Sequence, residues 1–154
     1  MLLPFFKWAD SMWVSEAIRA STWAFALLEV FHLFGLTLLL GTLAVVNLRL
    51  FGAGLKAPHI KDLAADAWPW TLRAGCVTIV SGFLLFASEA MKCYASGPFF
   101  IKMTLLITAL VFTFVFHKRM TQSDEPSGAS KFGACLSMAL WFGVGLAGRA
   151  IAFF

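Results

Sequence analysis

Charged residues are scarce in this chain of 154 residues. Only 13% of the residues are Asp, Glu, Lys or Arg, whereas 60% are hydrophobic, with 17 Phe and 6 Trp. A soluble domain carries roughly 25% charged residues, so the composition excludes an ordinary soluble protein. The formal net charge of +4 is scattered over the ends of apolar stretches and forms no basic patch, which excludes nucleic acid as the partner.

Cysteine is also rare, with three residues at Cys76, Cys93 and Cys135. None of them lies in a Cys-x-x-Cys-His run, so the spacing excludes covalent attachment of a c-type haem. Cys93 has no evident partner near its face of the membrane, and we expect no structural disulfide.

Long apolar stretches are what the chain has instead. A hydrocarbon core about 30 Å thick requires about 20 apolar residues per helix. Four stretches meet this length: residues 22–50, 70–91, 98–117 and 132–153. Residues 1–20 interleave charged and aromatic side chains without the basic start of a cleaved signal, which predicts an amphipathic helix at the membrane interface. We therefore expect an all-α fold, a single domain of residues 1–154 that forms an integral membrane four-helix bundle with an N-terminal interfacial amphipathic helix.

The distribution of Lys and Arg predicts the orientation of the bundle. Of the 12 basic residues, the larger share lies on the side of the first-to-second and third-to-fourth connections. Positive charge is enriched in cytoplasmic loops, so we expect both termini on the outer face of the membrane.

Glu29 and His32 lie one helical turn apart inside the first span and share a helical face. A charge near the bilayer centre costs about 3 kcal/mol, so such residues mark a site for a ligand, ion or cofactor. His32 lies about ten residues, roughly 15 Å, inside the outer end of its span, whereas His117 closes the third span at the cytoplasmic end. These depths disfavour a shared metal ion and predict two haems, each with a bundle imidazole as axial ligand. A di-iron site needs four carboxylates, and at most Glu29 and Glu89 lie at that level.

Four cationic residues are candidate partners of haem propionates. Lys102 and Arg149 lie toward the outer ends of the third and fourth spans, and Arg49 and Arg73 lie at the cytoplasmic ends of the first and second. The alternative is that these side chains snorkel to the interface. Arg149 lies within its span and needs an anionic partner, for which Glu29 is at a compatible depth.

The remaining candidate ligands have two interpretations each. His59, in the cytoplasmic connection 52–66, is either an exposed loop histidine or a second ligand beside His117. Cys76 and Cys135, on the same side as His117, are either ordinary small residues or part of a copper site. The glycines of the spans provide either close approach to a porphyrin or helix packing.

Several strings in the chain resemble those of a family of small bacterial four-helix membrane proteins catalogued as a domain of unknown function. They include Glu29-Val-Phe-His-Leu-Phe-Gly35, Asn47-Leu-Arg-Leu-Phe-Gly52, Pro98-Phe-Phe-Ile-Lys-Met103, Phe116-His117 and Ala147-Gly-Arg-Ala-Ile-Ala152. The resemblance implies a multi-pass protein of the bacterial inner membrane and supports His32, His117, Lys102 and Arg149 as site residues. It names no activity. Where the pattern commonly has an acidic residue before the Leu-Arg pair, this chain has Asn47.

The sequence as a whole predicts a membrane b-type cytochrome that binds one or two b haems at His32 and His117. Its task would be electron transfer with an unidentified redox partner, or, with a five-coordinate haem, oxidoreductase or sensor chemistry on a small oxidant or gas. A bundle of this size encloses two porphyrins poorly, so we expect a homo-oligomer in membrane lipid. Two alternatives stay open: a cofactor-free structural or channel-forming homo-oligomer, and a copper-binding membrane protein.

Overall fold

The computed structural model describes residues 2–52, 59–117, 119 and 127–151, with the backbone alone for residues 116 and 117. It is 91% helical, and the described residues contain no strand, which confirms the all-α class. The elements are α1 (Leu3–Asp10), α2 (Trp13–Ala20), α3 (Ala24–Phe51), α4 (Ile60–Ser88), α5 (Ala90–Ala95), α6 (Gly97–Phe112), the π-helix η1 (Thr113–His117) and α8 (Gly128–Ala150).

Four of these helices are long and apolar enough to cross a membrane: α3, α4, α6 with the start of η1, and α8. Large apolar side chains such as Phe25, Val30 and Phe34 on α3 are exposed on the outside of the bundle. In water such a surface would aggregate, whereas in lipid it is the expected surface of a spanning helix. The predicted membrane class and the four predicted spans are therefore supported by length, composition and exposure.

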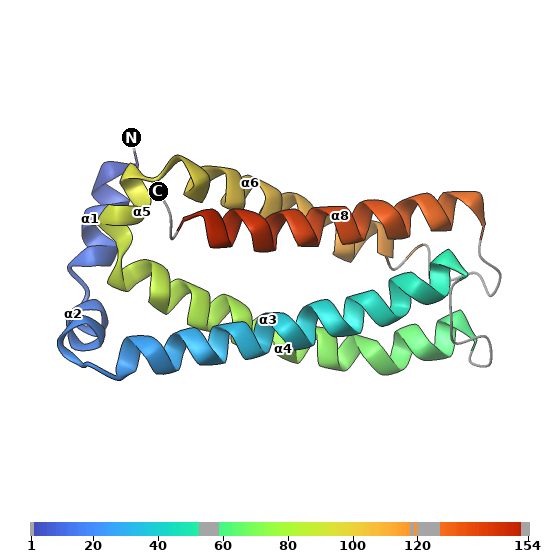
Figure 1. Cartoon of the computed structure of the whole chain (residues 1–154), viewed down its shortest axis with the longest axis horizontal. Coiled ribbons are helices and arrows are strands. Elements are labelled where there is room, and N and C mark those ends of the chain that lie inside the picture. The colour runs from blue at the N-terminus through green and yellow to red at the C-terminus, as the bar shows by residue number, and fades with distance from the viewer. Residues whose placement is uncertain (1, 53–58, 118, 120–126, 152–154) are drawn as a thin grey trace.

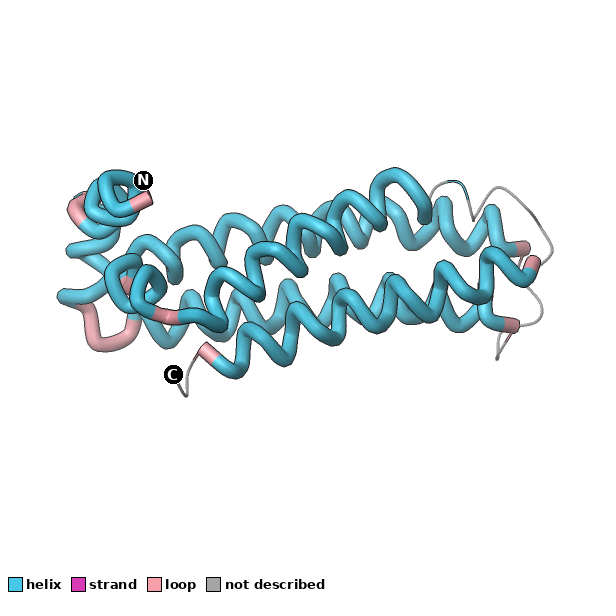
Figure 2. Tube along the Cα trace, turned by 90° about the horizontal axis from the view of Figure 1, so that it is seen from above, coloured by secondary structure: helices cyan, strands magenta, loops and turns pink. Residues whose placement is uncertain are grey.

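The four long helices form two antiparallel pairs (Figures 1 and 2). Helix α3 packs along α4, α6 packs along α8, and the two pairs meet where α3 contacts α8. Both chain ends and the segment from α4 to α6 lie at one end of the bundle, which we call the terminal end; α3 ends and α4 begins at the opposite end, the loop end (Figure 1). His32 therefore belongs to the terminal half of the bundle, while η1 carries His117 toward the loop end, as the predicted depths require.

The core is apolar in its middle and joined by hydrogen bonds between buried side chains elsewhere. Leu39 and Leu43 of α3 pack with Ala74, Trp141 and Val144 at the centre. Three side-chain pairs link neighbouring helices: Asn47 Nδ2 to Ser137 Oγ at 3.1 Å, Thr71 Oγ1 to Thr42 Oγ1 at 3.0 Å, and Trp141 Nε1 to Thr113 Oγ1 at 3.0 Å. Such bonds between membrane helices contribute about 0.6 kcal/mol each on average.

The N-terminal segment differs from the single helix expected over residues 1–20. It forms two short helices, because Met12 adopts an extended backbone (φ −65°, ψ 139°) between α1 and α2. Phe6 of α1 is buried against Phe86 and Phe99. Nη1 of Arg19, in α2, donates to Asp10 Oδ1 at 3.0 Å and to the carbonyl of Ser88 at 3.1 Å. The two helices therefore form a cap on the terminal end of the bundle (Figure 1).

Three predicted span boundaries differ from the ends of the helices by several residues. Helix α4 begins at Ile60, ten residues before the predicted start at 70, because its first turns contain Lys61, Asp62 and Asp66 and a search for apolar residues misses them. It ends at Ser88, so Met91 belongs to α5. Helix α8 begins at Gly128, where Ser127 Oγ accepts a hydrogen bond from Ser130 N as an N-cap.

Candidate functional site

His32 lies half-buried between α3 and α4. Its Nδ1 is 3.0 Å from the carbonyl oxygen of Thr78 and 3.1 Å from Ser81 Oγ. Thr78 and Ser81 lie on the stripe of α4 that faces α3, because Ala74 and Ser81 are both buried on that stripe. The imidazole is thus attached to the neighbouring helix by one ring nitrogen.

These two contacts define the tautomer of the neutral His32 ring. A carbonyl oxygen only accepts hydrogen bonds, so Nδ1 carries the proton and donates it toward Thr78 O. Ser81 Oγ donates its own proton to the carbonyl of Val77 at 2.6 Å, which leaves that oxygen as a second acceptor for Nδ1. The other nitrogen, Nε2, then carries a lone pair. An imidazole whose Nδ1–H is held by a backbone carbonyl is the usual form of a metal-bound histidine.

Two glycines make this arrangement of α3 and α4 sterically accessible. A Cβ at Gly82 would lie 2.9 Å from Cε1 and 3.3 Å from Nδ1 of His32, so the missing side chain provides the space that the ring occupies. A Cβ at Gly35 would lie 2.8 Å from Thr78 Oγ1 and 3.2 Å from Thr78 N, so Gly35 permits the close approach of the two backbones. Gly41 and Gly75 have no such neighbour within 4 Å. The helix-packing interpretation therefore fits Gly35, whereas Gly82 accommodates the histidine itself.

Lys102 is half-buried on α6, beside Gly148 of α8. A Cβ at Gly148 would lie 3.6 Å from its Nζ. Burial raises the pKa of the Cys93 thiol, so Cys93 is neutral at pH 7 and supplies no negative charge to Lys102.

Glu29 and Arg149 are both exposed. Arg19 forms an ion pair with Asp10, and Lys92 forms one with Glu89. Glu29 precedes His32 by three residues on α3, so the two side chains lie on the same side of that helix.

Arg49 is half-buried near the end of α3, at the loop end. Arg73, predicted at the cytoplasmic end of the second span, lies instead near the middle of α4, because that helix already begins at Ile60. The Arg73 side chain is exposed, and its guanidinium carbon lies 5.4 Å from the centroid of the Trp70 ring, a cation–π contact. His59 is exposed just before α4, as one of its two interpretations predicted. The side chain of His117 lies outside the described residues, so the second predicted haem ligand has a position along the chain but no described contacts.

The cysteines do not gather with other ligands. Cys76 and Cys135 are exposed and Cys93 is buried. Across residues 2–52, 59–115 and 127–151, no three His, Cys, Asp or Glu side chains are grouped to hold a metal ion.

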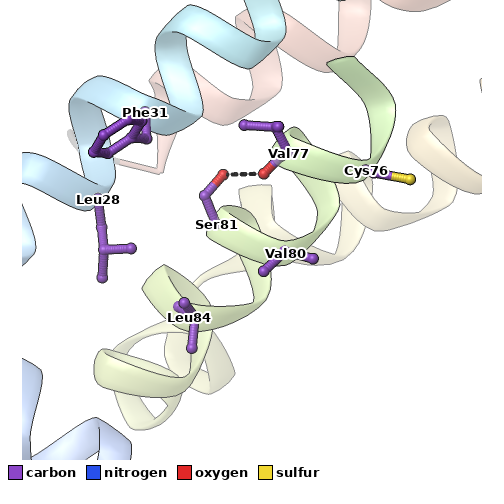
Figure 3. Close-up of a pocket in the computed structure, with 7 residues that line it drawn as sticks. All are labelled: Leu28, Phe31, Cys76, Val77, Val80, Ser81 and Leu84. Atoms are coloured by element: carbon purple, nitrogen blue, oxygen red, sulfur yellow. Dashed lines mark hydrogen bonds between the residues drawn. The ribbon is translucent and has the colours of Figure 1, made fainter. Parts of the chain in front are cut away.

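A shallow groove of about 350 Å³ lies between α3 and α4 on the outside of the bundle (Figure 3). Leu28 and Phe31 line it from α3, and Val77, Val80 and Leu84 line it from α4. Its one hydroxyl, that of Ser81, is bonded to the Val77 carbonyl, drawn as a dashed line in the figure. The groove therefore offers an apolar surface to lipid and no polar group that is free to recognise a ligand.

The sequence identified His32 and Lys102 but not Thr78 and Ser81, the groups that hold the imidazole. The signal that was available is the run of small residues Ala74, Thr78, Ser81 and Gly82 at helical spacing, which marks the α4 face that another helix approaches. Which histidine that face meets depends on the register between the two helices, and the sequence of each helix leaves that register open.

Comparison with known proteins gives a family and no activity. The sequence profile of a family described as a family of unknown function, DUF6644, matches residues 5–154. Neither a curated protein nor a solved structure matches the chain.

Proposed function

This chain belongs to the DUF6644 family of unknown function, and from the chemistry of its own site we propose that it is a membrane b-type cytochrome. The proposal assigns one haem b to the terminal half of the bundle, with Nε2 of His32 as axial ligand. The observation that supports it most is the hydrogen bond from His32 Nδ1 to the Thr78 carbonyl, because it leaves Nε2 with the lone pair that an iron ligand needs.

The residues around His32 fit this group. The Thr78 carbonyl orients the ring and increases the basicity of its other nitrogen. Gly82 leaves room between α3 and α4 for the imidazole itself. When bound, a haem supplies an iron that gains and loses one electron, and its potential depends on the axial ligand and on burial. The chain's own part is to hold the imidazole, exclude water with apolar helices and present the site to the membrane.

A second haem at His117 remains part of the proposal, so the protein would hold one or two haems per chain. We also propose the inner membrane as the location, with the terminal end and its α1–α2 cap on the outer face. A homo-oligomer would cover porphyrin edges that a single bundle leaves open.

The test is the visible spectrum of detergent-purified protein, oxidised and then reduced with dithionite. We expect a reduced α-band, with part of it lost in His32→Ala and none lost in His59→Ala. His59 is the matched control because it is exposed and lies at the N-terminus of α4. Colourless wild-type protein from haem-sufficient cells would refute the cytochrome, and unchanged haem content in a folded His32→Ala protein would refute the ligand.

A further inference from the structure

The exposed side chain of Arg73 starts from the middle of the bundle, far from both of its ends. Thr71 Oγ1 donates to Thr42 Oγ1 at 3.0 Å, and this contact aligns the antiparallel helices α4 and α3. Arg73 follows Thr71 by two residues, so it is level with Leu40 of α3. Leu40 lies one residue from the midpoint of 30–48, the stretch of α3 without Asp, Glu, Lys or Arg. At about 1.5 Å per residue this stretch matches the hydrocarbon thickness, which places Arg73 near the membrane mid-plane.

The central core supports the same depth from the other two spans. Ala74, the residue after Arg73, packs with Ala109 of α6 and Trp141 of α8. Each of these two residues lies one position from the midpoint of an uncharged stretch, 103–117 for Ala109 and 132–148 for Trp141. All four spans therefore place the same level of the bundle at the middle of the membrane.

Arg73 has no anionic partner among the residues that the structure describes. Its guanidinium contacts the Trp70 ring, three residues nearer the loop end, and takes part in neither of the ion pairs given above. Asp66, the nearest carboxylate on α4, lies seven residues or about 10 Å away along the helix. The level of Arg49, where α3 becomes charged again, is nine residues or about 14 Å away. The guanidinium thus stays within the apolar layer, where an uncompensated charge costs free energy.

Arg73 belongs to a stripe of exposed side chains on α4 that also contains Trp70, Val77 and Val80 at helical spacing. The groove between α3 and α4 continues this stripe toward the terminal end, because Val77 and Val80 line it (Figure 3). We call the stripe and the groove together the α4 face. Side chains of a helix that packs along α4 would fit into such a groove.

We propose that the α4 face binds a transmembrane helix of a different protein, and that an Asp or Glu near the middle of that helix forms an ion pair with Arg73. Lipids and other amphiphiles keep their anionic groups in the interfacial region, whereas a residue of a spanning helix is held at the depth of Arg73 by its own chain. A second copy of this chain lacks the required group, since Asp66 is the described carboxylate nearest to the mid-plane and lies about 10 Å from it. The inference does not depend on the proposed haem.

The test uses synthetic polyleucine helices of about 21 residues, long enough to span the bilayer. One peptide has Glu at its centre, the second has Gln there, and the third has Glu at one end. The full chain, labelled at its N-terminus, is reconstituted in phosphatidylcholine vesicles, and association is measured by energy transfer to a label on each peptide. A charge-assisted hydrogen bond should make the central-Glu peptide bind about tenfold more tightly than the central-Gln peptide. The end-Glu peptide should bind like the Gln peptide.

Arg73→Leu should abolish the preference for the central-Glu peptide, and Arg73→Lys should keep part of it. Leucine replaces an exposed charge by an apolar group, so we expect Arg73→Leu to fold and to unfold at the wild-type temperature or above. The matched control is Lys131→Leu, which removes an exposed cation of α8 near the loop end and should keep the wild-type preference. Arg73→Lys provides a folded variant for comparison if Arg73→Leu does not fold.

Equal affinity of the wild-type protein for the Glu and Gln peptides would overturn the inference, as would a preference that survives in Arg73→Leu. A preference that disappears when phosphatidylglycerol is added would assign Arg73 to lipid phosphate and refute a protein partner. Cys76 is exposed and lines the groove, so a short bismaleimide applied to native membranes in a Cys135→Ser background reports a second copy. Efficient joining of two chains through Cys76 would show that a second copy covers the α4 face, contrary to our inference. None of these results changes the test of the haem at His32.

Discussion

Gly82→Ala is the substitution that tests the His32 site most directly. The added Cβ would lie 2.9 Å from His32 Cε1 and 3.3 Å from Nδ1, closer than side-chain atoms tolerate. The imidazole has to swing away from α4, which breaks its bonds to the Thr78 carbonyl and to Ser81 Oγ. Insertion of a methyl group into a packed site costs about 1–3 kcal/mol, and each lost hydrogen bond adds about 0.5–1.5 kcal/mol.

The matched control is Gly75→Ala, seven residues earlier on the same helix, where a Cβ meets nothing within 4 Å. Alanine is the better helix former by about 1 kcal/mol, so this variant should unfold at the wild-type temperature or above. We expect Gly82→Ala to be at least about 2 kcal/mol less stable than Gly75→Ala in the same detergent and to lose haem on dilution. Two glycine variants with equal stability and equal haem content would show that the His32 ring does not depend on the space at Gly82.

Three further predictions test how the helices are held together. Gly35→Ala should weaken the α3–α4 contact by about 1–3 kcal/mol, since its Cβ meets Thr78 backbone, while Gly41→Ala stays neutral; equal thermal midpoints would contradict this. Asn47 is 1% exposed and its Oδ1 has no hydrogen-bond partner. Ser137→Ala leaves the whole Asn47 amide unpaired, at a loss of stability of about 1–3 kcal/mol, so Asn47→Leu should lower the stability by less. The reverse order of the two variants in chemical unfolding would refute the reasoning. Arg19→Met removes the three hydrogen bonds from α2 to Asp10 and Ser88. Since the Arg19–Asp10 ion pair is partly exposed, the loss of stability should be about 1 kcal/mol or less, while proteolysis between α1 and α2 should become faster. An unchanged cleavage rate would show that aromatic packing alone holds the cap.

The helices could be predicted from the sequence much further than the site. The length of the apolar stretches located all four spans, because lipid requires about 20 apolar residues per crossing. The boundary errors occur in segments that contain charged residues or lie outside the apolar stretches. The start of α4 contains charged residues, and the segment before Ala24 is folded back by Met12. The cost of placing ionisable groups in a membrane directed attention to His32 and Arg149, and the charge of haem propionates directed attention to Lys102. Their contacts depend on how α3 is aligned with α4 and α6 with α8, and that alignment is set by side-chain packing across helices far apart in sequence.

His117 illustrates a second limit. An apolar run ending in histidine predicted a regular helix to that residue, whereas the last turn is the π-helix Thr113–His117. A π-turn takes up one more residue than an α-turn. Periodicity counted from Pro98 therefore assigns positions beyond Thr113 to the wrong face, although their depth along the span is still correct.

The contact between His32 and the Thr78 carbonyl has a consequence for how this sequence can vary over evolution. The acceptor is a backbone atom, which every amino acid at position 78 supplies except where it bends the helix. Position 82 lacks this freedom, because any side chain there enters the volume of the ring. Among relatives that retain the histidine, we therefore expect position 78 to vary among small residues and position 82 to remain glycine. Relatives that have lost the histidine should accept other residues at position 82 as well.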